Sequence, residues 1–63
     1  MTYRGSMFNG KRNGIGEIIY VGGHHFKGEF EDNIAEGKGV FYFKNGNSLA
    51  GIWRRGILVD SFD

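Results

Sequence analysis

The segments Tyr3-Arg4-Gly5-Ser6-Met7, Phe26-Lys27-Gly28-Glu29-Phe30 and Leu49-Ala50-Gly51-Ile52-Trp53 start 23 residues apart and share one pattern. In each, a glycine stands two positions after one large apolar residue and two positions before another. Gly14 and Gly37, and likewise Gly16 and Gly39, repeat at the same spacing. A fixed period of roughly 20–50 residues is typical of repeat architectures, whose units bury their apolar faces against their neighbours. The sequence therefore predicts one domain, residues 1–63, with repeats at 3–25 and 26–48 and a partial repeat at 49–63.

Each repeat is predicted to be one β-hairpin. Large and small residues alternate over residues 3–8, and Asn9 to Asn13 is rich in turn-forming residues. Residues 14–20 return as a second strand, and tight turns follow at 21–23 and 44–46. Asn33 replaces glycine in the second loop, where a left-handed backbone is expected. Without proline or a helical pattern, the chain is predicted to be all-β, an antiparallel hairpin meander in one sheet.

The two-residue period of a strand predicts which side chains share a face. One face collects the residues of the repeated pattern, and we interpret it as the core, with rings lying over bare glycine backbone, in preference to a ligand- or base-stacking platform. Its predicted members are Tyr3, Gly5, Met7, Gly14, Gly16, Phe26, Gly28, Phe30, Gly37, Gly39, Leu49, Gly51 and Trp53. On the returning strands, Ile18, Tyr20, Phe41 and Phe43 are expected to join them.

The opposite face is also more apolar than solubility requires. Alternation places Ile15, Ile19, Val21, Val40, Tyr42, Ala50 and Ile52 there, among charged residues. Apolar side chains rimmed by charge are typical of a protein interface. The sequence therefore predicts a protein-binding surface on this face, with self-association as its simplest form.

The third repeat departs from the pattern. Asp60 and Phe62 stand at the phase of Gly14/Gly37 and Gly16/Gly39, and residues 57–63 form an apolar tail in place of the expected returning strand. Two interpretations stay open. The tail folds back as a cap on the last hairpin, or it docks a partner and leaves the 49–54 strand edge free to pair with another chain.

The residues Tyr3-Arg4-Gly5-x-Met7-x-x-Gly10-x-x-x-Gly14-x-Gly16, and Phe26-Lys27-Gly28-x-Phe30 through Gly37-x-Gly39, resemble MORN (membrane occupation and recognition nexus) repeats. The resemblance covers nearly the whole chain. It implies an elongated, twisted antiparallel meander that serves as an interaction scaffold, with contact to phospholipid as a further implied property. It does not imply catalysis, which in relatives belongs to attached domains.

No catalytic, cofactor or metal site is expected. His24 and His25 are consecutive, so a strand directs them to opposite faces. The serines lack a nucleophile-elbow turn, and the Gly-x-Gly pairs run into β-rich sequence without a phosphate-binding helix. Eight basic residues nearly balance seven acidic ones, so nucleic-acid binding is not expected and lipid binding is expected to be weak. The absence of cysteine and of a signal-like start favours the cytoplasm.

The sequence thus predicts a non-enzymatic protein-interaction module that self-associates as a homodimer and occupies a surface of another, unidentified protein. The candidate contacts are Ile19, Val21, Tyr42, Ile52, Ile57, Leu58 and Phe62. Two alternatives stay open. One is a small phage or mobile-element inhibitor of a bacterial defence enzyme, similar in kind to an anti-CRISPR, and the other is a phospholipid-binding membrane adaptor.

Overall fold

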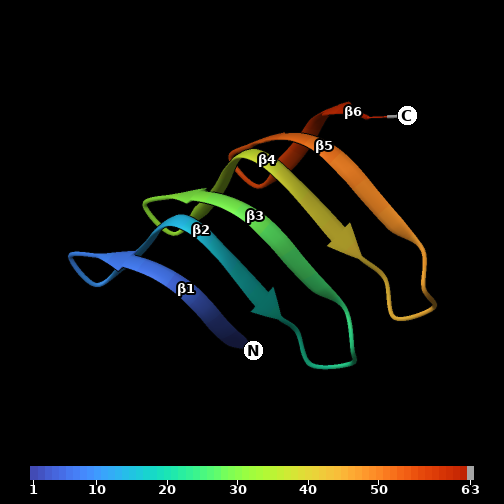
Figure 1. Ribbon diagram of the computed structural model, residues 1–63, viewed down its shortest axis with the longest axis horizontal. Helices are drawn as coiled ribbons and strands as arrows, with labels where there is room; N and C mark the ends of the chain where they lie inside the picture. Colours follow the sequence, from blue (N-terminus) through green and yellow to red (C-terminus); the bar gives the residue numbers. More distant parts are fainter. Residues whose placement is uncertain (63) are drawn as a thin grey trace.

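The computed structural model describes residues 1–62 and consists of six antiparallel strands in one open sheet, arranged in sequence order (Figure 1). The strands are β1 (Thr2–Phe8), β2 (Lys11–Ile19), β3 (His25–Glu31), β4 (Ile34–Tyr42), β5 (Ser48–Arg54) and β6 (Ile57–Ser61). The predicted all-β hairpin meander is confirmed. Strands β1 and β6 form the two edges of the sheet. Asp63, the last residue of the predicted tail, lies outside the described residues.

Two kinds of turn alternate along the chain. Asn9-Gly10, Asp32-Asn33 and Arg55-Gly56 are two-residue turns with positive φ at both positions, the requirement of a type I′ hairpin turn. Asn33 has a φ of 74°, against 75° for Gly10, so it takes the glycine conformation as predicted. The tight turns at 21–23 and 44–46 are also present, each closed by paired backbone hydrogen bonds.

A row of small residues crosses the whole sheet at one level. Five successive register pairs join Gly5, Gly16, Gly28, Gly39, Gly51 and Ser61. The rings of this face lie directly on that row, since a Cβ on Gly39 would overlap Cζ of Phe26. A Cβ on Gly28 would stand 2.6 Å from both the Cα of Gly39 and the carbonyl oxygen of Lys38. The row therefore lets strands and rings approach more closely than residues with a Cβ permit.

The core is smaller than the sequence predicts. Within residues 1–62, four side chains are buried, Ile18, Phe26, Phe30 and Trp53, and the ring of Phe26 meets those of Phe30 and Trp53 edge to face. Met7 and Phe43 point to the same side but are 55% and 39% exposed. Met7 lies on an edge strand and Phe43 lies beyond the end of β4, so fewer neighbours cover them. With a shortest extent of 14 Å, the molecule is a single layer.

Neighbouring hairpins are tied at their turns by repeated contacts. The N–H of Asp32 donates to Oδ1 of Asn13 (3.2 Å), and 23 residues later the N–H of Arg55 donates to Oε1 of Glu36 (3.1 Å). The N–H groups of Asn33 and Gly56 donate to the carbonyls 21 residues earlier, at 3.0 Å each. Each of the first two hairpins thus offers acceptors to the hairpin that follows it.

The expectation that the third repeat lacks a returning strand is wrong. Residues 57–61 form β6 and pair with β5, Arg54 opposite Ile57 and Trp53 opposite Leu58. The edge of the 49–54 strand is therefore covered, which favours the cap over the docking tail at the level of the backbone. Ile57 and Phe62 nevertheless stay more than half exposed.

The third hairpin differs in register by one residue. In each of the first two hairpins, the returning strand has a bulge in which three residues face a single residue of the first strand. In the first hairpin, Asn13 to Ile15 face Ser6. Gly14 and Gly37 sit in these bulges with φ of 88° and 109°, where a side chain is strained. Asp60 has no such φ, and only Val59 and Asp60 lie opposite Ile52. Ser61 therefore lies opposite Gly51, although Phe62 is the residue that stands at the phase of Gly16 and Gly39.

The indole of Trp53 makes the one buried side-chain hydrogen bond recorded within residues 1–62, from Nε1 to the carbonyl oxygen of Gly39 (2.9 Å). Trp53→Phe is expected to destabilise the fold by about 1–3 kcal/mol, because it leaves that carbonyl without its donor. Urea unfolding followed by circular dichroism measures the loss. Met7→Leu, at the same phase on exposed β1, is the control and should leave the midpoint unchanged. Equal midpoints for both variants would show that this hydrogen bond does not stabilise the sheet.

Candidate functional site

The sheet has two unlike faces, and the strand registers assign each residue to one of them. The aromatic face carries the glycine row and the buried rings. The outer face is its reverse, and its central row runs from Arg4 through Glu17, Lys27, Val40 and Ala50. Charged residues fill this row on β1 to β3, and apolar residues fill it on β4 and β5. The apolar character of the outer face is therefore concentrated toward β4, β5 and β6.

We define the outer patch as the apolar residues that gather on that half of the outer face. Ala50 lies at its centre, paired with Val40 on β4 and tied to Phe62, whose N–H donates to the Ala50 carbonyl (2.8 Å). Tyr42 and Ile52 lie two residues further along their strands and share this face. The members of the outer patch are Val40, Tyr42, Ala50, Ile52 and Phe62. Lys38 and Asp60 lie beside Ile52 on its two neighbouring strands, so the patch has a charged rim.

The predicted contact residues do not all reach this patch. Tyr42, Ile52 and Phe62 belong to it, and Ile19 joins it through His25, which pairs with both Ile19 and Tyr42. Val21 is 87% exposed in the turn after β2. The other two predicted contact residues, Ile57 and Leu58, lie on opposite faces of the sheet.

Ile57 pairs with Arg54 on the outer face at the start of β6. Leu58 lies opposite Trp53 on the aromatic face, where it packs against the core. Their alternation follows from β6 being a strand, so the sequence grouped two side chains that the sheet directs to opposite sides.

His25 stacks on Tyr42 on the outer face, with ring centroids 4.7 Å apart and an interplanar angle of 21°. This contact orients the Tyr42 ring within the outer patch. His24 lies on the other face against Phe41 and Phe43, and its Nδ1 accepts a hydrogen bond from the N–H of Lys44 (3.1 Å). The two histidines thus face opposite sides, as strand alternation predicts. Within residues 1–62, no group of three or more His, Cys, Asp or Glu side chains is placed to hold a metal ion.

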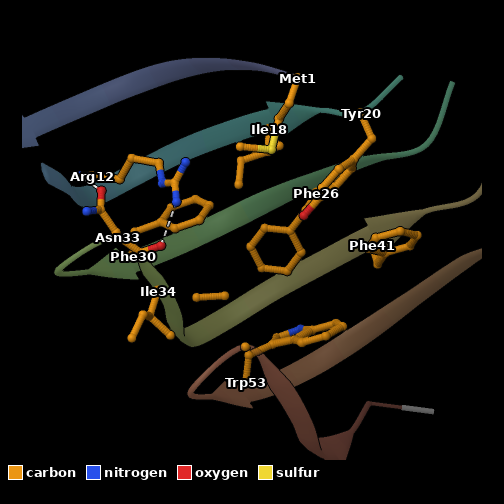
Figure 2. A pocket seen from close by; sticks show the side chains of 12 residues that line it. Met1, Arg12, Ile18, Tyr20, Phe26, Phe30, Asn33, Ile34, Phe41 and Trp53 are labelled. Carbon is orange, nitrogen blue, oxygen red and sulfur yellow. Dashed lines mark hydrogen bonds between the residues drawn. The ribbon is translucent and has the colours of Figure 1, made fainter. Parts of the chain in front are cut away.

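The aromatic face holds an open groove of about 320 Å³ (Figure 2). Its lining comprises Met1, Arg12, Ile18, Tyr20, Phe26, Phe30, Asn33, Ile34, Ala35, Phe41, Trp53 and Gly56. Such a volume is at the low end for ligand pockets, about 300–1,000 Å³. Phe26, Phe30 and Trp53 form its floor and are already buried against one another. The groove therefore exposes less apolar surface than its residue types suggest.

Arg12 lies at one end of the groove and was not singled out by the sequence analysis. Its guanidinium carbon stands 5.7 Å from the Tyr3 ring centroid and 6.0 Å from that of Phe30, and its Nη2 donates to the Asn33 carbonyl (2.9 Å). The residues 23 and 46 positions later are Ala35 and Leu58, both packed against the core. Because both equivalent residues are apolar and face the core, the 23-residue period could have placed Arg12 on the aromatic face. Arg12 thus covers the rings of Tyr3 and Phe30 at this end of the groove.

The described part of the chain has no helix long and apolar enough to cross a membrane.

The family model of the MORN repeat matches the chain twice, at residues 3–25 and 26–48. Together the two matches cover the first two hairpins and most of the chain. No curated protein matches the chain significantly.

Proposed function

Because the chain belongs to the MORN repeat family, whose repeats are generally protein- or lipid-binding modules, we propose that it is a non-enzymatic module that binds another protein. The outer patch is the proposed contact surface, with Ile19 and Val21 extending it. The module acts by occupying a surface of its partner, and it also associates with itself.

The observation that carries the proposal is the contiguity of the outer patch. Val40 on β4, Ala50 on β5 and Phe62, the residue after β6, form one row, and Tyr42 and Ile52 flank that row. Because the molecule is a single layer 14 Å thick, no second layer within residues 1–62 covers this face. Contiguous apolar side chains inside a charged rim are the composition expected of a protein interface.

The charge pattern supports a protein partner over a lipid surface. On the outer face Arg4, Lys27 and Lys38 alternate with Glu17 and Glu29. An anionic membrane attracts clustered basic residues at about 1 kcal/mol each, and interspersed carboxylates offset that attraction. A mixed surface instead suits a protein whose charges alternate in the opposite sense.

The small core supports self-association. The chain exposes 4422 Å², whereas a compact monomer of 7.1 kDa is expected to expose about 4,100 Å². Domains of this length rarely gain more than ~3–5 kcal/mol from their core. Binding that occurs only in the folded state adds directly to this stability.

Tyr42→Arg is expected to weaken partner binding at least about tenfold, because it places a charge within an apolar contact. The experiment captures partners from lysate with the full chain, identifies the recovered protein by mass spectrometry and titrates it in purified form. Ile15→Arg is the matched control, since Ile15 lies on the same face but on β2, outside the patch. The control should bind like the wild type, and circular dichroism should show both variants folded.

Equal affinities for the wild type and Tyr42→Arg would exclude the outer patch as the contact surface. Binding to anionic vesicles alone, lost on raising the salt concentration, would replace the protein partner by a lipid surface.

A further inference from the structure

One position of the repeat is buried twice and exposed once. Met7, Phe30 and Trp53 are equivalent by the 23-residue period, yet Phe30 and Trp53 are 5% and 9% exposed while Met7 is 55% exposed. Phe30 has strand neighbours on both sides, Gly14 and Ala35, whereas Met7 has only Arg12. What distinguishes Met7 is therefore the lack of a strand on the outer side of β1.

The two edges of the sheet differ in their capacity to accept such a strand. β1 has seven residues, one charge at Arg4 and no proline. β6 has five residues, a bulge at Val59 and a charge at Asp60, and bulges and charges are the features that protect a sheet edge from pairing. Val59 also stands at the phase of Asn13 and Glu36, whose side chains accept hydrogen bonds from the next hairpin, and its side chain has no acceptor. The capacity to pair is thus concentrated at β1.

We propose that β1 pairs with β1 of a second copy of this chain, antiparallel, with Gly5 opposite Gly5 of the second copy. The product is a closed two-fold dimer with one continuous sheet. Pairing β1 with β6 of another copy would instead repeat without end and give fibres, and the bulge of β6 opposes it.

The register follows from two properties of β1. Gly5 is the midpoint of Thr2–Phe8, so this alignment pairs the strand over its full length. It also extends the row of small residues, in which every ladder of the sheet already places glycine opposite glycine or serine. Met7 then lies opposite Tyr3 of the second copy, and Arg4 lies opposite Ser6, so no like charges face each other directly.

This inference rests on the self-association in the proposed function and assigns it to the β1 edge, leaving the outer patch for a different protein. Analytical ultracentrifugation of the full chain over a range of concentrations tests it. Met7→Lys is expected to raise the dimer dissociation constant at least about tenfold, because the charge enters an apolar cross-strand pair. Val59→Lys is the matched control, with the same 55% exposure on the other edge strand, and should dimerise like the wild type.

Cross-linking tests the register independently. The chain contains no cysteine, and the proposed alignment places Thr2 opposite Phe8 of the second copy. Thr2→Cys with Phe8→Cys is expected to form a reducible covalent dimer on mild oxidation, since directly opposite residues have the Cα spacing of a disulfide. Neither single variant should do so, because its two copies of the same thiol stand about 20 Å apart along the seam.

The outcomes separate the two claims. A wild type that stays monomeric at every concentration would overturn the self-association in the proposed function together with this inference. A dimer that survives Met7→Lys, without cross-linking of the double variant, would overturn the β1 assignment alone. Open-ended assemblies would favour pairing of β1 with β6 and would also overturn the two-fold dimer.

Discussion

Gly28→Val is expected to unfold the chain at 25 °C. The added side chain would start 2.6 Å from backbone atoms of Gly39 and Lys38 on β4, and no rotamer moves a Cβ. Strands β3 and β4 would have to separate at the centre of the sheet. Such overpacking is expected to cost about 3–5 kcal/mol, which equals the stability that a domain of this size rarely exceeds.

Far-UV circular dichroism and a thermal scan measure this effect. The matched control is Gly10→Asn, since Gly10 has no atom within 4 Å of an added Cβ and Asn33 natively takes the same φ. The control is expected to melt within about 0.5 kcal/mol of the wild type. A cooperative melt of Gly28→Val near that of the wild type would show that the sheet does not depend on close approach at the glycine row.

Phe26→Ala is expected to cause a loss of similar size. Phe26 is the most buried side chain of the core, and its ring lies edge to face with Phe30 at 5.5 Å and with Trp53 at 5.1 Å. It also covers Gly39, so its removal exposes backbone as well as rings. Truncating a buried phenylalanine costs about 3–5 kcal/mol, and the variant should be largely unfolded without a partner.

Urea unfolding, monitored by Trp53 fluorescence, reports this loss. Phe43→Ala is the control, because Phe43 is an aromatic residue on the same face that stays 39% exposed. Its midpoint should fall much less than that of Phe26→Ala. Equal losses for the two phenylalanines would contradict a core centred on Phe26 and would favour a stability spread evenly over the aromatic face.

The first two repeats could be predicted from the sequence because each of their positions is constrained locally. Glycine spacing, large residues two positions away and turn residues such as Asn33 all point to the same hairpin, and two-residue alternation then separates the faces. The same reasoning failed for the third repeat. There it treated Asp60 and Phe62 as a break in the pattern, whereas the chain shortens the bulge and still pairs through Ser61.

The binding surface illustrates the same limit. Tyr42 and Ile52 could be assigned to the outer face because they lie in strands whose phase the glycines define. Leu58 was grouped with them from its apolar character alone, yet it lies opposite Trp53 and packs on the core. Phe62 reaches the outer patch only because of the one-residue shift, since at its original phase it would lie opposite Gly51 on the aromatic face.

The sequence by itself determined the repeat, the first two hairpins, the left-handed backbone of Asn33 and the faces of the first five strands, because these depend on residues close together in the chain. Only the tertiary structure decided that 57–61 forms a strand, how long its bulge is and which side chains are buried. The longer bulge contains a glycine with positive φ, such as Gly37, whereas the shorter bulge at Val59 and Asp60 contains no residue with positive φ. Burial depends on having a strand on both sides, which is why Phe30 is covered and the equivalent Met7 is not.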